Sequence, residues 1–259
     1  MTRPRGPAGA AGVVLWCATP APTVGAAAAV LSPAEHRRAA AFRLAADRER
    51  FVTARVLVRA AAGEVLGCRP AEVGLRVDGP RDPAPGRPFV PGGPAVSIAH
   101  AGARVLVAVL DLPGAQVGTD VEAVAAVAAH RDGLRDAVAE AERPPGGWTP
   151  AALARAWVRR EAVLKAVGTG LLVHRDDLVL GRADGPAAVR STRPPLPPAD
   201  TLRVRDVVLP AAPAGAGGHP AGPDGHRAAV AVHLPGGGEL AVAVADATEL
   251  LARAGAPAA

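Results

Sequence analysis

The clearest structural signal in the sequence is a helix with both ends marked, between Thr149 and Gly168. Threonine commonly caps a helix N-terminus, and Pro150 suits the first helical position because its fixed backbone angle matches the helix. Glycine is the residue type that most often ends a helix. The sequence therefore predicts a long helix over residues 150–167.

Weaker signals place helices and strands in both halves of the chain. Ser32 and Glu35 have the spacing of a capping box, with a proline at the first helical position. Asp47 is the candidate cap of a second helix, whose apolar residues recur at helical spacing until Gly67. The other expected elements are a first strand at 13–18, a Pro/Gly-rich loop over 78–93, strands at 95–99 and 103–110 around a turn, a strand at 116–121, and antiparallel strands at 204–209, 228–234 and 240–245.

Each half of the chain thus combines helices with a small sheet, which predicts an α+β fold. Residues 1–12 are expected to form a flexible leader. Pro113-Gly114 is the expected boundary between an N-terminal subdomain, residues 13–113, and a C-terminal subdomain, residues 114–259, which carries the acidic motifs discussed below.

Composition narrows the class of protein. Hydrophobic residues make up 49% of the 259 residues and charged residues 20%, which is enough apolar material for a core and excludes a disordered chain. The two cysteines do not form a disulfide framework or a zinc motif, so a reducing, cytoplasmic location is expected. No apolar run reaches the roughly 18 residues of a membrane span, although residues 3–17 resemble a weak signal peptide.

The basic side chains are unevenly divided between arginine and lysine. The net charge is +5, and 28 of the 29 basic residues are arginine, as in chains from GC-rich genomes. An arginine is therefore a weak sign of function here. The single lysine, Lys165, is a stronger sign of a site that needs an ammonium group.

The segment Val-Gly-Thr-Asp-Val-Glu at 117–122 places two carboxylates two positions apart on a predicted strand. Residues at i and i+2 of a strand project to the same face, so Asp120 and Glu122 would lie side by side. A like-charged pair is unfavourable unless a cation or a proton lies between them, and carboxylates are ligands that suit Mg²⁺. The motif alone leaves two interpretations open, a magnesium site or a solvent-facing strand end.

A second cluster lies on the predicted long helix. Trp157, Glu161 and Lys165 recur every four residues and therefore share one face. They form either an ordinary Glu–Lys surface pair or part of a functional site, in which lysine, unlike arginine, can also hand over a proton.

The order of these elements resembles the Sfp-type 4′-phosphopantetheinyl transferase family. The resemblance rests on Gly-Arg-Pro at 86–88, a strand that ends in His100, Gly-Thr-Asp-Val-Glu at 118–122, and Trp-Val-Arg-Arg-Glu-Ala-Val-Leu-Lys-Ala-Val-Gly at 157–168. It extends from about residue 38 to residue 172, and the last motif is its most specific part. The family implies two similar subdomains in a pseudo-twofold arrangement, with the active site in the cleft between them.

The resemblance also implies an enzyme that moves the 4′-phosphopantetheine arm of coenzyme A to a serine of an apo acyl or peptidyl carrier protein. The reaction would need Mg²⁺ and release adenosine 3′,5′-bisphosphate. A monomer is expected, with no nucleic-acid or membrane partner. The implied roles are magnesium ligands at Asp120, Glu122 and Glu161, catalytic groups at Glu161 and Lys165, and coenzyme A contacts at Arg43, Arg48, Arg87, Pro88, His100 and Lys165.

The sequence departs from the family pattern at several positions. Ala99 replaces the serine that usually precedes the histidine, and Arg87 and Arg160 replace lysines. The aromatic pair that commonly precedes the helix motif is missing, and Glu140 or Glu142 would stand for the glutamate that accompanies it.

Two alternative functions remain open. A degenerate family member would bind coenzyme A or a carrier protein without turnover. A basic nucleic-acid-binding protein is favoured only by the net charge, because the chain has six aromatic residues and no basic run.

Overall fold

The computed structural model describes residues 10–20, 27–78, 86–170, 173–211 and 225–254. Helices and strands are both abundant in it, which confirms the expected α+β class. The strands are β1 (Ala10–Ala18), β2 (Arg76–Asp78), β3 (Arg87–Phe89), β4 (Ala95–Ala101), β5 (Arg104–Leu110), β6 (Gln116–Ala123), β7 (Leu178–Leu180), β8 (Val189–Thr192), β9 (Leu202–Val207), β10 (His226–His233) and β11 (Glu239–Asp246). The helices are α1 (Pro33–Ala40), α2 (Ala45–Leu66), α3 (Val124–Ala129), α4 (Arg131–Ala137), α5 (Pro150–Val167) and α6 (Thr248–Ala254).

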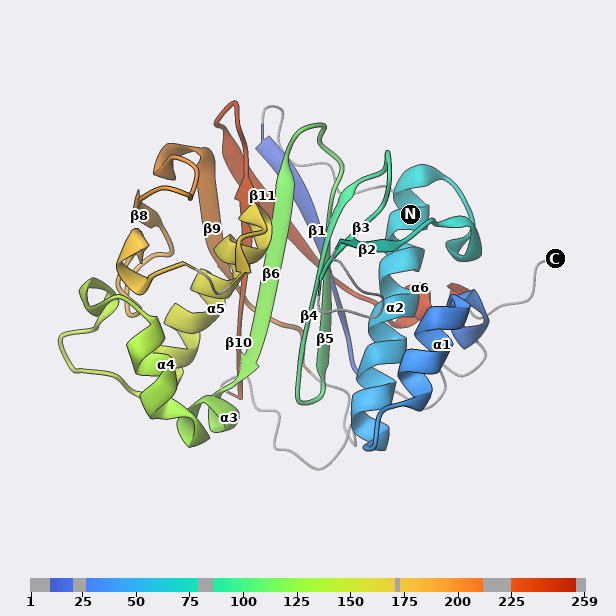
Figure 1. Cartoon of the computed structure of the whole chain (residues 1–259), viewed down its shortest axis with the longest axis horizontal. Coiled ribbons are helices and arrows are strands. Elements are labelled where there is room, and N and C mark those ends of the chain that lie inside the picture. Colours follow the sequence, from blue (N-terminus) through green and yellow to red (C-terminus); the bar gives the residue numbers. More distant parts are fainter. Residues whose placement is uncertain (1–9, 21–26, 79–85, 171–172, 212–224, 255–259) are drawn as a thin grey trace.

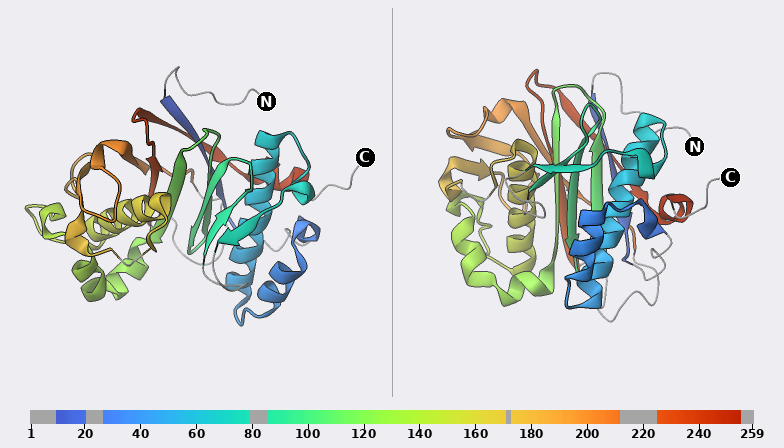
Figure 2. Two further views of the ribbon diagram at one scale, coloured as in Figure 1. Left: turned by 45° about the horizontal axis from the view of Figure 1, so that its top comes forward. Right: turned by 45° about the vertical axis from the view of Figure 1, so that its right-hand side comes forward.

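Two main sheets lie between the two long helices. One sheet has four strands in the order β11-β1-β5-β4, and the other has three in the order β6-β10-β9. Helix α2 packs on the outer face of the first sheet and α5 on the outer face of the second (Figures 1 and 2). Each half thus has a sheet and a covering helix, while the pseudo-twofold relation between the halves stays a prediction.

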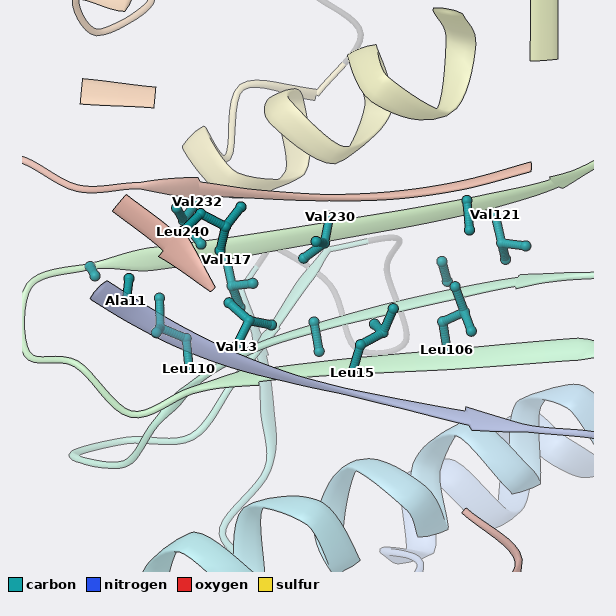
Figure 3. Close-up of a cluster of buried hydrophobic side chains, with 14 of the residues drawn as sticks. Ala11, Val13, Leu15, Leu106, Leu110, Val117, Val121, Val230, Val232 and Leu240 are labelled. Carbon is teal, nitrogen blue, oxygen red and sulfur yellow. The ribbon is translucent and has the colours of Figure 1, made fainter. Parts of the chain in front are cut away.

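The central core fills the space between the two sheets, and it follows from the alternation of side chains along each strand. In β5, Leu106 and Leu110 point into this space, whereas Val107 points towards α2. Val117 of β6 and Val230 of β10 complete the central layer from the second sheet (Figure 3). A strand covered on both faces can be apolar throughout, and β5 is buried along its whole length.

At the helix termini, the structure confirms two of the three N-terminal caps that the sequence predicts. Helix α5 begins and ends where its caps predict, with the Thr149 hydroxyl accepting from Ala152 N and Gly168 in a left-handed conformation at φ 78°. The predicted capping box of α1 is also confirmed. The expected cap at Asp47 is wrong: α2 already begins at Ala45, and the Asp47 carboxylate instead pairs with Arg50 one turn later.

Two other expectations about strands need correction. Residues 87–89 were expected in a loop, but they form β3 and pair with β2, Val77 opposite Pro88. The strand at the C-terminus was expected to be antiparallel, but β11 pairs parallel with β1, Val13 opposite Val242. The reason for the second error is tertiary: β5 occupies one edge of β1, and the other edge is available to a strand that arrives from the far end of the chain.

The expected domain limits stay a prediction. Residues 10–12 of the expected leader belong to β1, and residues 1–9 lie outside the described part. The β1–β11 pairing and the packing of α6 against α2 both cross the proposed division at residue 113. Within the described residues, no helix is long and apolar enough to cross a membrane.

Candidate active site

The candidate site is built on an unusually close approach of strand β6 to helix α5. A Cβ atom placed on Gly118 would lie 2.0 Å from the carbonyl oxygen of Ala162 and 2.5 Å from the backbone nitrogen of Ala166. Only glycine fits there, because a methyl group at these distances would overlap the helix backbone. The close contact brings the side chains that follow Gly118 on its face of the strand against the Glu161–Lys165 turn of the helix.

Asp120 and Lys165 form an ion pair across this contact. Lys165 Nζ lies 2.6 Å from Asp120 Oδ1 and 3.3 Å from the Thr119 carbonyl oxygen. Asp120 is 6% exposed, so the interpretation of a solvent-facing strand end is wrong for this residue. The alternative of a plain Glu–Lys surface pair is also wrong, because the ion pair of Lys165 is made to the strand.

Glu122 and Glu161 lie beside this pair, and the charges of Asp120 and Lys165 affect the pKa of both carboxyl groups. Burial raises the pKa of Glu122 to about 7, with the neighbouring Asp120 carboxylate as the second cause and a hydrogen bond from the Trp157 side chain opposing the rise. Burial and then the charge of Asp120 raise the pKa of Glu161 as well, against the influence of Lys165. The strand and the helix thus gather three carboxylates, and the charge of Lys165 partly relieves their mutual repulsion.

The chemistry of this donor set suits a magnesium ion. Two of its carboxylate oxygens, Asp120 Oδ2 and Glu161 Oε1, are buried and have no hydrogen-bond partner. Buried, unpartnered anionic oxygens are costly, and a hard divalent cation is a ligand that would satisfy them. In the described part of the chain, however, no three acidic, histidine or cysteine side chains are already arranged as a metal site. The residues therefore fit the ion in type and charge, and Glu122 and Glu161 would have to adjust to bind it.

His100 of the N-terminal half lies close to Lys165 of this cluster. It is the next-to-last residue of β4, and desolvation followed by the charges of Arg50 and Lys165 lowers its pKa. Arg50 donates from Nη1 to the Gly102 carbonyl oxygen at 3.0 Å, which ties the start of α2 to the β4–β5 turn.

The coenzyme A contacts expected at Arg43 and Arg48 stay predictions, and Arg50, a nearby cation, was not among the expected contacts. Arg43 and Arg48 are exposed, and neither contributes to the pKa of His100 as Arg50 does. The spacing of charges along the helix could have indicated Arg50. It lies three residues after Asp47, its ion-pair partner, so the two side chains share one face of α2.

Arg87 and Pro88 sit on β3, next to the far end of α5. The Arg87 guanidinium donates to the Gln116 side-chain oxygen, and a Cβ on Gly168 would lie 3.4 Å from Arg87 Nη1. Arg87 thus lies beside the Gly168 end of α5, and β3 contacts the start of β6 at this point.

Arg160 and Glu142 are buried, and both hydrogen-bond to the backbone of the segment that follows α5. Arg160 is 2% exposed and donates to the carbonyl oxygens of His174, Arg175 and Leu178 at 2.9–3.0 Å, which an ammonium group would reach less completely. Glu142 is fully buried and accepts from the Leu180 backbone nitrogen at 3.0 Å. Of the two candidates for the family's glutamate, Glu142 is the one that packs beneath the motif helix, whereas Glu140 is exposed and paired with Arg143.

The comparison with known families agrees with the location of these residues. Residues 116–210 match the family model described as the 4′-phosphopantetheinyl transferase superfamily. A search of curated proteins found no match. The matched segment covers β6, where Asp120 and Glu122 lie, and α5, where Glu161 and Lys165 lie. The chain therefore carries, at residues 116–210, a region similar to the 4′-phosphopantetheinyl transferase superfamily, and its charged cluster falls inside that region.

Proposed function

We propose that the protein is an Sfp-type 4′-phosphopantetheinyl transferase, which moves the phosphopantetheine arm of coenzyme A to a serine of an apo acyl or peptidyl carrier protein. The observation that carries the proposal is the pairing of Asp120 on β6 with Lys165 on α5, with Glu122 and Glu161 beside it. The superfamily match at residues 116–210 supports the reaction class. A monomer in the cytoplasm, with a cleft between residues 13–113 and 114–259, completes the proposal.

The reaction exchanges a phosphoanhydride bond for a phosphate ester bond. The serine oxygen of the carrier forms a bond to the phosphorus that bears the pantetheine arm. The bond from that phosphorus to the bridging pyrophosphate oxygen breaks, and adenosine 3′,5′-bisphosphate leaves. Because the reacting group is already highly charged, catalysis consists mainly of positioning and of stabilising charge on the phosphate oxygens.

The side chains of this chain divide that work between them. Asp120, Glu122 and Glu161 would hold Mg²⁺, which supplies positive charge to the pyrophosphate when bound. Glu161, directly or through a water, is the candidate to accept the proton of the carrier serine, because it is a carboxylate of the cluster beside Lys165. Lys165 stabilises the leaving phosphate with a compact positive charge and can give it a proton.

The remaining cations would hold the nucleotide end of coenzyme A. The charges of Arg50 and Lys165 both lower the pKa of His100, so His100 lies near both side chains. Arg87 and Pro88 approach from β3, next to the end of α5. Arg50 joins Arg43 and Arg48 as a candidate for this contact.

An assay of the purified protein tests the proposal directly. The protein is incubated with coenzyme A and an apo carrier protein, either with Mg²⁺ or with a chelator. The mass of the intact carrier protein is then measured by mass spectrometry. Transfer adds the mass of one phosphopantetheine group only when the metal is present. Binding of coenzyme A without any mass change across several carriers would favour the degenerate relative, and no binding at all would overturn the proposal.

A further inference from the structure

Gln116 is the only residue in the chain with a side-chain amide. The 259 residues contain one glutamine and no asparagine. Because the chain contains so few side-chain amides, the presence of Gln116 calls for an explanation, as does the presence of the single lysine. Gln116 is the first residue of β6, two positions before Gly118, and it is only partly exposed.

The amide of Gln116 meets the guanidinium of Arg87. Its oxygen accepts a hydrogen bond from Arg87 Nη2, which joins β3 of the N-terminal half to β6 of the C-terminal half. On its own sheet, Arg87 lies directly opposite Asp78 in the β2–β3 pairing. The Gly168 end of α5 lies against Nη1. Three elements therefore confine the guanidinium, and within the part of the chain that the structure describes only Gln116 gives it a side-chain hydrogen bond.

We propose that Gln116 is a positioning residue, which fixes the guanidinium of Arg87 at the junction of the two halves so that its remaining N–H groups bind an anionic group of coenzyme A. The proposal rests on the proposed function. An arginine has five donors in a rigid plane, so one can be used for support while others remain for a phosphate oxygen.

A contact that only held the two strands together would not need an uncharged side chain at position 116. A glutamate at this position would also accept from Arg87, and more strongly. It would, however, add a second negative charge beside a cation that already faces Asp78, and so weaken the attraction of Arg87 for a phosphate. An amide supports the guanidinium without neutralising it.

Two substitutions at Gln116 separate these roles. Gln116→Leu keeps the size and removes the acceptor, while Gln116→Glu keeps the acceptor and adds charge. Coenzyme A binding is measured by isothermal titration calorimetry on the full chain with Mg²⁺ present, and thermal unfolding is followed on the same preparations. Ser191→Glu on β8, an exposed position, serves as the control for an added negative charge.

We expect Gln116→Leu and Gln116→Glu each to raise the Kd for coenzyme A by about 5- to 10-fold, the scale of one supported charge contact. Gln116→Glu should unfold at or above the wild-type temperature, and Ser191→Glu should bind as the wild type does. Arg87→Ala should raise Kd by about 10-fold, and adding Gln116→Leu to it should raise Kd no further.

Each outcome has one meaning. Wild-type affinity in Gln116→Glu would show that the contact only holds the two halves together. A loss in the double variant equal to the product of the two single losses would show that Gln116 acts without Arg87. If Gln116→Leu does not fold, Gln116→Glu still decides. If the wild-type protein itself binds no coenzyme A, the proposed function fails, whereas normal binding by every Gln116 variant overturns only this proposal.

Discussion

Lys165 Nζ lies 2.6 Å from Asp120 Oδ1, and this pair joins the helix motif to the strand motif. The only lysine of the chain thus forms an ion pair with a buried aspartate, while a third of the lysine side chain stays exposed. The pairing gives the ammonium a fixed position next to two further carboxylates, Glu122 and Glu161. Several of the expected effects of mutation depend on this arrangement.

Lys165→Arg should separate a charge requirement from a requirement for lysine itself. Arginine keeps the positive charge, but it is bulkier, forked and unable to give up a proton at neutral pH. We expect kcat to fall by about 10²-fold, the usual scale for a positioned acid or charge stabiliser, with a melting temperature near that of the wild type. Turnover and melting are measured on one preparation. Wild-type kcat in this variant would reduce Lys165 to a structural partner of Asp120.

Asp120→Asn should reduce activity. The side chain is 6% exposed and ion-paired, so it is not the solvent-facing carboxylate of a strand end. We expect transfer to fall by about 10²-fold or more and Mg²⁺ binding to weaken in calorimetry. Asp132→Asn, at an exposed position of α4, is the matched control. Unchanged Mg²⁺ affinity would remove Asp120 from the proposed ligands.

Gly118→Ala should be among the most damaging small substitutions in the chain. The new Cβ would lie 2.0 Å from a helix carbonyl, so α5 must move away from β6. We expect the free energy of unfolding to fall by about 3 kcal/mol, as for overpacking of a rigid core. Gly133→Ala is the control: Gly133 lies in α4 with no atom within 4 Å of its Cβ position, and alanine there should add about 0.5–1 kcal/mol. Urea unfolding of both variants gives the comparison, and equal stabilities would contradict the close packing.

Glu142 should make stability depend on pH. Burial raises its pKa to about 7 from an ordinary value of 4.5. Between these values the folded state keeps a proton that the unfolded state has lost, so the contribution of Glu142 is fully present below pH 4.5 and is lost as pH rises through about 7. Glu142→Gln is neutral throughout and escapes this loss. Its unfolding free energy relative to wild type should therefore rise by up to about 3 kcal/mol between pH 4.5 and pH 8.

Glu140→Gln, on the exposed side of the same turn, controls for the removal of a carboxylate. A difference between Glu142→Gln and wild type that stays constant with pH would mean that folding does not raise the pKa of Glu142.

Local signals in the sequence predicted local structure well. Helix α5 begins after Thr149 and ends at Gly168 because caps act through hydrogen bonds within one turn. The same holds for the capping box at Ser32. The motif residues were also placed on the elements that carry them, Asp120 on a strand and Lys165 on a helix.

What the sequence could not predict depends on packing between distant segments. The burial of Asp120 follows from the approach of α5 to Gly118, which no local pattern encodes. The contact of Arg50 with the β4–β5 turn depends on which side of α2 faces that turn. The roles assigned to these residues stay predictions until they are measured.

The parallel pairing of β1 with β11 has a consequence for how the chain reaches its native state. The sheet that supports α2 needs a strand made from residues 239–246, so it cannot be completed while the C-terminal part is still being synthesised. Contacts of such large sequence separation slow folding, because a long loop must close before they form. During translation, the unpaired edge of β1 is exposed on an apolar strand, which is the condition under which nascent chains aggregate or recruit chaperones.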